Sequence, residues 1–410
     1  MSDARAERLP SYAVFAALLA SAGLPIYIHA PKFFVDEYGV SLAAVGFVLF
    51  GLRLFDFVQD PLLGWLSEAL RRWRAFAVAT SVLIMAVSMV GLFAIEPPVH
   101  PLAWFALTLT GLFTSFSFLT INFYAQGVVK ARDLGAGGHV RLATWRETGA
   151  LLGICAAAVA PTVLVMLSAS PFAVFGAGFA VFAGVAAWAM RQEWRTTSTA
   201  PPAGIRPILR DKISRRLLLI ALLNATPVAV TSTLFLFFVE SRLDAPGFEG
   251  PLLLVFFLAA AGSAPVWGWI AKRIGPKKAL LAGMVLAIVS FGFAAMLGAG
   301  DWPLFAVICL ASGAALGADM TLLPAIFADR MATVAPDAGQ AFGLWSFVSK
   351  FTLAFAAVIL LPLLEAAGFE AGASNPEEAL VMLTILYALL PCALKLFAIG
   401  LLAVTSLKES

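Results

Sequence analysis

Residues 52–61 read Leu-Arg-Leu-Phe-Asp-Phe-Val-Gln-Asp-Pro and lie in the middle of an otherwise apolar segment. In a helix, Asp56 and Asp60 project about 40° apart, so both carboxylates share one face, and Arg53 falls on that face too. Each ionisable group at the centre of a bilayer costs roughly 2.5–3.5 kcal/mol on insertion scales. Such groups usually mark an ion or substrate pathway. We therefore interpret this stretch as a cation-coupling site.

The composition indicates a membrane protein. Of the 410 residues, 61% are hydrophobic and 12% are charged, whereas soluble domains carry about 25% charged residues. The net charge of +3 is too small to favour nucleic acid as a partner. The sequence contains no metal-spaced His/Cys cluster, nucleophile elbow or nucleotide loop. We therefore expect neither an enzyme nor a bound cofactor.

Apolar runs of roughly 20 to 28 residues, each long enough to cross about 30 Å of hydrocarbon, recur twelve times. They begin near residues 10, 43, 73, 101, 139, 170, 214, 249, 277, 302, 337 and 378. A polar, Arg-rich break separates the sixth run from the seventh. This pattern predicts an all-α membrane protein of 12 transmembrane helices, in the two six-helix bundles of the major facilitator fold. Residues 1–191 would form the N-terminal bundle, 192–213 a cytoplasmic linker and 214–410 the C-terminal bundle.

Basic residues occur in alternate loops. One set of loops, which includes the linker, carries Arg71, Arg72, Arg74, Lys130, Arg132, Lys272 and Arg273. The opposite loops carry Asp36, Glu37, Glu96, Asp301, Glu370 and Glu377. The positive-inside rule places the basic loops in the cytoplasm. We therefore expect a multi-pass protein of the cell inner membrane with both termini in the cytoplasm.

The two halves of the chain repeat. Residues 33–36, Phe-Phe-Val-Asp, recur as Phe-Phe-Val-Glu at 237–240, and Pro-x-x-Gly-Trp at 61–65 recurs at 265–269. Both matches have the same offset of 204 residues. A twofold repeat of six helices is the architecture of alternating-access transporters, with the binding site near the midplane between the halves.

The same offset exposes an asymmetry between the halves. Asp56 and Asp60 correspond to Ala260 and Ala264 in the second half. If the acids only supported the fold, the second half would be expected to need them as well. Their restriction to the first half favours a specialised coupling role.

Lys350 corresponds to Arg146 in the first half, so each half carries one deep cation. Lys350 lies roughly 20 Å into its predicted helix at 1.5 Å per residue, too deep for its side chain to reach the interface comfortably. We predict that Lys350 and Arg53 form a charge network with the two acids. The alternative is that this network is a purely structural set of ion pairs.

Four of the predicted helices carry residues that match the sequence pattern of a known family. They are Arg53, Asp56, Asp60, Pro61, Gly64 and Trp65 in the second, Trp145, Arg146 and Gly153 in the fifth, Ala328 and Asp329 at the end of the tenth, and Gly343, Trp345 and Lys350 in the eleventh. Together they resemble the melibiose permease family, the glycoside–pentoside–hexuronide:cation symporters of the major facilitator superfamily. The resemblance implies that Asp56 and Asp60 bind Na⁺ or H⁺ with Gln59 beside them. It also implies that Lys350 closes the network and that Arg146 lies at a sugar pocket.

The chain departs from this family where the family holds sugar hydroxyls. Ala20 stands where the sugar permeases carry an Asp, and residues 120–124 of the fourth helix contain no carboxylate. Thr120 or Asn122 takes the place of the family's fourth-helix acid and is a predicted cation ligand. A branch of the same fold moves lysolipids with Na⁺ while keeping the helix-two acids and the helix-eleven lysine. The solute therefore does not follow from the cation site.

The coupling ion is Na⁺ or H⁺. Two close carboxylates cannot both ionise cheaply unless a cation lies between them, so an entering ion neutralises the pair. Na⁺ needs several oxygen ligands, which Gln59 and the hydroxyl groups of Thr114, Ser117 or Thr120 could supply. With one acid fewer than the family pattern, H⁺ coupling also fits.

Two further charged residues are candidate solute ligands. Arg146 could hold an anionic or hydroxylated part of the solute, or it could form an ion pair with Glu147. Asp319 lies in the middle of the tenth predicted helix. It could replace the missing sugar acids from the opposite half, or it could hydrogen-bond to a neighbouring helix.

Three aromatic residues, Tyr27, Tyr124 and Trp345, could stack on a sugar ring or simply pack. The sequence thus predicts symport of a small polar, sugar-like solute with Na⁺ or H⁺ by alternating access, with a lysolipid or an organic anion as the alternative solute. We expect a monomer whose partners are the solute, a monovalent cation and membrane lipid. A membrane sensor without transport is a third possibility, but it leaves the asymmetry of the acids unexplained.

Overall fold

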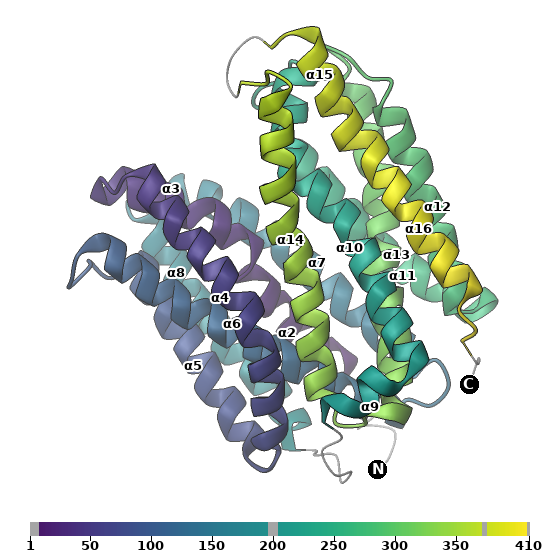
Figure 1. Ribbon diagram of the computed structural model, residues 1–410. Helices are drawn as coiled ribbons and strands as arrows, with labels where there is room; N and C mark the ends of the chain where they lie inside the picture. The colour runs from purple at the N-terminus through teal and green to yellow at the C-terminus, as the bar shows by residue number, and fades with distance from the viewer. Residues whose placement is uncertain (1–7, 196–203, 371–374, 408–410) are drawn as a thin grey trace. The chain divides into compact units, whose positions relative to one another are not determined.

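The computed structural model describes residues 8–195, 204–370 and 375–407. These residues form helices joined by short connections, and no strand occurs among them (Figure 1). Ten of the described helices are long and apolar enough to cross a membrane, and α2 is shorter. The predicted all-α membrane fold is therefore confirmed, and the predicted number of 12 spans is matched approximately by the described residues.

The chain divides into two compact units. The N-terminal unit comprises Met1–Ile208 and Met331–Phe347, and the C-terminal unit comprises Leu209–Arg330 and Val348–Ser410. The first division falls within the linker predicted at 192–213, of which residues 196–203 lie outside the described residues. The sequence did not indicate that the short segment Met331–Phe347 packs with the first half.

The N-terminal unit is built from seven long or medium helices. They are α2 (Leu9–Ser21), α3 (Leu24–Tyr38), α4 (Leu42–Ala69), α5 (Arg74–Phe93), α6 (Pro101–Asp133), α7 (Gly138–Val165) and α8 (Pro171–Met190). Proline in the first turn suits the starts of α6 and α8, because its missing N–H group would have no helical partner there. Ser41 caps α4 by accepting a hydrogen bond from the backbone N–H of Ala44 at 3.2 Å.

The first predicted span is two helices rather than one. Gly23, between α2 and α3, has φ −91° and ψ −115°, which is outside the helical region. Hydropathy alone could not show this break, because the apolar run continues through it. The other helices begin close to their predicted starts, for example α6 at Pro101 and α8 at Pro171.

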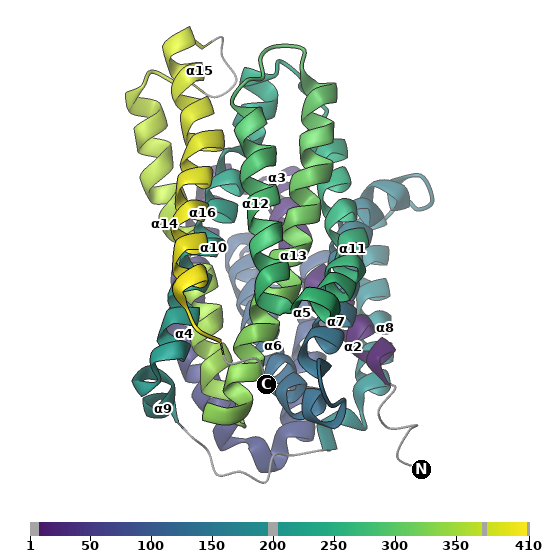
Figure 2. The same cartoon turned by 90° about the vertical axis from the view of Figure 1, so that its right-hand side faces the viewer.

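The C-terminal unit has a second set of helices. They are α9 (Ile205–Arg210, shared with the N-terminal unit), α10 (Lys212–Phe237), α11 (Glu249–Ile274), α12 (Pro276–Ala294), α13 (Trp302–Val334), α14 (Gly339–Ala366), α15 (Glu377–Thr384) and α16 (Leu390–Val404). Helix α16 packs along α10 and α12 (Figures 1 and 2). The first turns of α14 and the last turn of α13 belong to the N-terminal unit.

Two π-helical turns interrupt the α-helical pattern of the C-terminal unit. The turn η3 (Phe238–Arg242) continues α10, and η4 (Ile385–Leu389) joins α15 to α16. The rings of Phe238 and Tyr387 stack with centroids 4.2 Å apart and an interplanar angle of 15°. The two turns therefore contact each other through an aromatic pair in the core of this unit.

Helices α2 and α7 approach each other very closely in the N-terminal unit. A Cβ atom on Gly149 would lie 2.1 Å from the carbonyl oxygen of Ala13, and one on Gly153 would lie 2.4 Å from that of Ala17. Such distances are too short for any side chain. The four-residue spacing on both helices is the small-residue pattern that lets membrane helices pack backbone to backbone.

We predict that Gly153→Ala destabilises the protein, because its methyl group would collide with the α2 backbone. Overpacking of this kind typically costs about 1–3 kcal/mol, and a lowered midpoint of thermal unfolding in detergent would show it. Gly184→Ala in α8 is the matched control, since a Cβ atom there meets nothing within 4 Å. Alanine favours a helix more than glycine does, so the control should melt no lower than the native chain. Equal effects of both substitutions would contradict the close packing.

Candidate functional site

The two acids of α4 lie in the interior of the N-terminal unit. Asp56 is 6% exposed and Asp60 is fully buried. The amide nitrogen of Gln59 donates to Asp56 Oδ1 at 2.7 Å, and Gln59 Oε1 accepts from the hydroxyl of Thr114 in α6 at 3.1 Å. The hydroxyl of Ser346 in α14 donates to Asp60 Oδ2 at 2.6 Å. The structure thus gathers two carboxylates, one amide and two hydroxyl groups.

The ligand chemistry of this cluster is that of a hard cation or a proton. The carboxylate, amide and hydroxyl oxygens of this cluster suit ions such as Na⁺ rather than soft transition metals. Among the described residues no group of three or more His, Cys, Asp or Glu side chains is placed to hold a metal ion. Either carboxylate could instead take up a proton, so the donor set fits both predicted coupling ions.

Thr114 of α6 hydrogen-bonds to Gln59, which in turn contacts Asp56. The hydrogen bonds of Asn122 are to other residues, since its Oδ1 accepts from the hydroxyl of Ser67 at 2.9 Å and its amide donates to the carbonyl of Phe118 at 2.8 Å. Ser67 follows Asp60 in α4 by about 10 Å of helix at 1.5 Å per residue. The hydroxyl of Thr120 is buried without a hydrogen-bond partner. Thr114 is thus one predicted hydroxyl ligand that the structure places against Gln59, and a role of Thr120 or Asn122 in ion binding stays a prediction.

The predicted charge network includes one residue from each unit. Arg53 is half-buried in α4, one helical turn before Asp56. Lys350 is half-buried in the part of α14 that belongs to the C-terminal unit. Their pairing with the acids stays a prediction.

Arg146 lies in a buried cluster of the N-terminal unit. Its Nε donates to Glu147 Oε1 at 2.7 Å, and the hydroxyl of Tyr124 donates to the same oxygen at 3.0 Å. The guanidinium carbon lies 3.7 Å from the centre of the Tyr124 ring. The ion pair with Glu147, one of the two predicted alternatives, is therefore present. The Nη2 group of Arg146 is nevertheless buried without a hydrogen-bond partner, so the guanidinium keeps unused donors.

The predicted aromatic residues are spread over three helices. The ring of Tyr124 in α6 lies 5.1 Å from that of Phe342 in α14. Trp345 is half-buried in α14. The side chain of Tyr27 in α3 lies outside the described residues. Of the three, Tyr124 is the one that the structure places beside Arg146.

Asp319 pairs with a residue that the sequence analysis overlooked. It is buried in α13, and Lys395 of α16 donates to its Oδ2. The predicted alternative, a bond to a neighbouring helix, therefore describes this contact. The signal was available, because Lys395 is a single lysine in the middle of the last apolar run.

A second group of polar residues, whose partners the sequence did not identify, joins α4 and α5 to Met331–Phe347. Arg74 donates to Asp337 at 2.7 Å, and both side chains are only 1% exposed. Glu68 accepts from the backbone N–H and the amide of Gln340 at 3.0 and 2.8 Å. This polar network fixes the short segment onto the first half.

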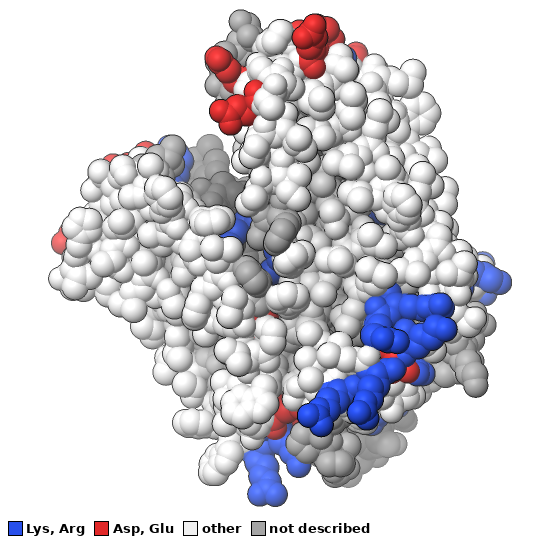
Figure 3. Space-filling view, viewed as in Figure 1, with Lys and Arg blue, Asp and Glu red and all other residues white. Residues whose placement is uncertain are grey.

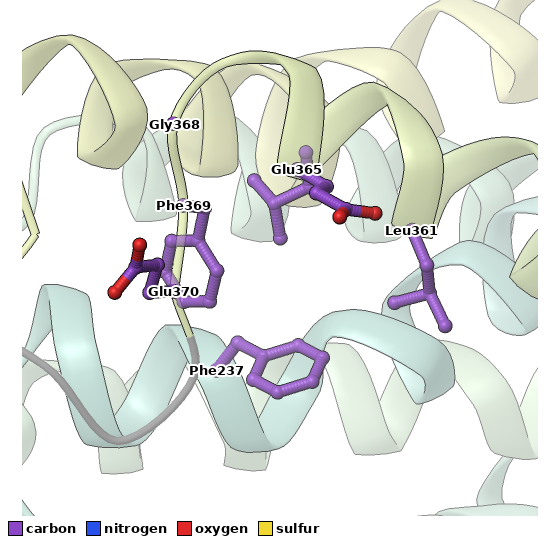
Figure 4. A pocket seen from close by; sticks show the side chains of 7 residues that line it. Phe237, Leu361, Glu365, Gly368, Phe369 and Glu370 are labelled. Carbon is purple, nitrogen blue, oxygen red and sulfur yellow. The ribbon is translucent and has the colours of Figure 1, made fainter.

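A cavity of about 430 Å³ occurs in the C-terminal unit, at the end of α14 (Figure 4). The rings of Phe237 and Phe369 line it with centroids 5.5 Å apart, together with the carboxylates of Glu365 and Glu370. None of the predicted site residues lines this cavity. It is therefore separate from the sites described above.

Many apolar helices with ionisable side chains buried among them indicate a polytopic membrane protein with a functional site in its interior. The chain matches the family described as MFS/sugar transport protein over residues 10–409, and it belongs to this family of the major facilitator superfamily. The family consists of transporters of small-molecule solutes, so the predictions of a transporter and of a protein that is not an enzyme are confirmed.

Solved transporters share the fold. A bacterial homologue of the iron transporter ferroportin, crystallised in an outward-facing state, is 15% identical with a TM-score of 0.67, covering 95% of this chain and 99% of its own. Its crystal form with soaked iron gives a TM-score of 0.71 at 15% identity, with 96% and 98% covered. The E. coli fucose:proton symporter FucP is 15% identical with a TM-score of 0.65, covering 97% and 99%. No curated protein matches significantly.

We predict that Arg74→Met lowers the thermal stability of the protein more than the double substitution Arg74→Met with Asp337→Leu. Removing one partner of a buried ion pair leaves an uncompensated charge and typically costs about 3–5 kcal/mol, whereas replacing both is often nearly neutral. Thermal unfolding of the single and double variants measures this difference. Lys32→Met is the control, since it breaks a pair whose side chains are 76% and 58% exposed. A double variant no more stable than the single one would contradict the buried pair.

Proposed function

We propose that this transporter is a cation-coupled symporter that moves a small polar solute by alternating access. The observation that carries the proposal is the buried pair of Asp56 and Asp60, surrounded by the oxygens of Gln59, Thr114 and Ser346. In an apolar helix such a pair is too costly to keep without a role. The coupling ion is Na⁺ or H⁺, and it neutralises the pair.

The hydrogen bond between Asp60 and Ser346 links ion binding at Asp60 to the position of helix α14. Ser346 lies in α14 just before the boundary at Phe347–Val348, and this helix continues into the C-terminal unit. A charged carboxylate accepts a stronger hydrogen bond than a neutral one. Binding of H⁺ or Na⁺ at Asp60 therefore weakens the hydrogen bond from Ser346 of α14, and release of the ion strengthens it again.

The solute site is proposed on the cluster of Arg146, Glu147 and Tyr124, where the unused Nη2 donors of Arg146 can bind a hydroxylated or anionic group. Tyr27, Trp345 and Asp319 remain proposed solute ligands. Arg53 and Lys350 remain the proposed charge network, and Thr120 and Asn122 remain proposed ligands of the coupling ion. The motif resemblance supports a melibiose permease-like subfamily and a sugar-like solute. A lysolipid or an organic anion is the second candidate, because both sugar-holding acids of that family are absent.

The proposed orientation places both termini on the cytoplasmic side of the inner membrane. Within the C-terminal unit, basic side chains gather over α9 and the start of α10, and acidic ones gather at the α15 end (Figure 3). A basic end faces the cytoplasm by the positive-inside rule. We propose that the protein acts as a monomer in contact with lipid, without a cofactor other than the coupling ion.

We predict that Asp60→Asn removes the response of the protein to its coupling ion. A ligand that binds the folded state stabilises it by about 2.7 kcal/mol at a hundred times its dissociation constant. Thermal unfolding of the purified protein is measured in sodium chloride and in choline chloride, each over a range of pH. The native chain should be stabilised by Na⁺ or by acidification. Asp60→Asn and Asp56→Asn should lose that response, whereas Glu378→Gln on exposed α15 should keep it.

In proteoliposomes the same two variants should exchange solute across the membrane yet fail to accumulate it against a gradient. Candidate solutes come from a thermal-shift screen of sugars, organic acids and lysolipids. Accumulation at the native level by Asp56→Asn and Asp60→Asn would contradict the proposed coupling site.

A further inference from the structure

A buried polar cluster in the C-terminal unit joins three helices. Asp319 of α13, Lys395 of α16 and Asn224 of α10 are 6%, 4% and 5% exposed. The ammonium group of Lys395 donates to Asp319 Oδ2, and Asn224 lies beside the same carboxyl group. Ionisable groups this deep in membrane helices usually mark an ion or substrate pathway.

Two oxygen atoms of this cluster lack a donor. Oδ1 of Asp319 and Oδ1 of Asn224 are both buried without a hydrogen-bond partner. Buried acceptors in proteins nearly always have one, and a proton on the Asp319 carboxyl group would supply it. An amide can donate to a carboxylate and can also accept from a carboxylic acid. Asn224 can therefore hydrogen-bond to Asp319 in either protonation state.

The packed helices supply no second charge to this cluster among the described contacts. From α11, Ser263 and Trp267 hydrogen-bond to the carbonyl of Ala314. From α12, Gly283 packs against the residue that precedes Asp319. On α16, the thiol of Cys392 donates to the carbonyl of Ile288. Asp319 and Lys395 therefore balance each other, and a change of charge on one has to be matched at the other.

Charge balance sets what this cluster can bind. A proton on Asp319 removes the negative charge opposite Lys395, and a buried ammonium group without a counter-charge is strongly unfavourable. An anion on Lys395 restores neutrality. Conversely, an anion cannot replace Asp319 on Lys395 while that carboxylate is still charged, because the two negative charges would repel. Proton and anion therefore bind together or not at all.

We propose that Asp319, Lys395 and Asn224 form a solute site that takes one proton on Asp319 together with the carboxylate of an organic anion on Lys395. The proton adds to the Asp319 carboxyl group, the ion pair with Lys395 breaks, and an ammonium–carboxylate pair with the solute replaces it. The total charge of the site is unchanged. This inference rests on the proposed transport function and narrows its second candidate solute, an organic anion, to the organic monocarboxylates.

The test uses the purified full chain in detergent and three probes, namely sodium acetate, lactate and gluconate. Sorbitol serves as the uncharged control, and sodium is kept constant. At least one of the anions should stabilise the native chain against heat more at acidic than at alkaline pH. Its apparent affinity should fall about tenfold per pH unit once Asp319 is charged, as linkage of one proton to one anion requires. Addition of the anion to weakly buffered protein should take up one proton per site.

Variants separate this site from a structural ion pair. Asp319→Asn is neutral at every pH, so it should bind the anion with a flat pH profile and, at alkaline pH, more tightly than the native chain. Lys395→Met should lose anion binding, and the neutral double variant should stay folded without binding. Asp60→Asn should keep the anion response, so loss of its Na⁺ or pH response bears only on the proposed coupling site.

Three results would overturn the inference. They are the absence of any pH-dependent stabilisation by the three anions in the native chain, a native pH profile of anion binding in Asp319→Asn, and anion binding that survives in Lys395→Met. If Asp319→Asn fails to fold, two measurements still test the inference: proton uptake by the native chain on addition of the anion, and anion binding by the double variant. A structural ion pair predicts no proton uptake and no gain of binding in any variant.

Discussion

The need to balance charge in a medium without water governs the arrangement of both units. An ion taken from water into a low-dielectric interior costs several kcal/mol unless a partner meets it with good geometry. Arg74 and Asp337 satisfy this constraint in the N-terminal unit, and Lys395 and Asp319 satisfy it in the C-terminal unit. Asp337 lies in the connection between α13 and α14, whereas Asp319 and Lys395 belong to the helices α13 and α16. The second pair therefore constrains the rotation of two helices by charge as well as by packing.

Features that depend on one helix could be predicted from the sequence. Run length and hydropathy place the starts of the helices, and helical spacing alone puts Asp56, Gln59 and Asp60 on one buried face. Features that depend on two helices could not. Which hydroxyl of α6 meets Gln59 depends on the rotation of that helix about its axis. Thr114 rather than Thr120 faces it, and no spacing rule in a single chain decides between them.

Other differences between expectation and structure have equally specific causes. The break at Gly23 leaves the apolar run intact, so hydropathy cannot register it. The packing of Met331–Phe347 with the first half depends on Arg74 and Glu68, which lie far away in the chain. The contact of Gly153 with α2 needs a partner backbone that the glycine itself does not identify. Long-range partners of this kind are the information that a single sequence lacks.

The π-helical turn η4 determines where one side chain points. Its i→i+5 hydrogen bonds take up more residues per turn than an α-helix does, so every residue after it is rotated about the helix axis. Lys395 follows this turn and meets Asp319 with that rotation included. Deleting one residue from η4 would turn the ammonium group by about 100°, towards a different neighbour. The direction in which Lys395 projects from α16 is therefore set by the backbone that precedes it. An insertion or deletion in η4 would break the ion pair although both charged residues are still present.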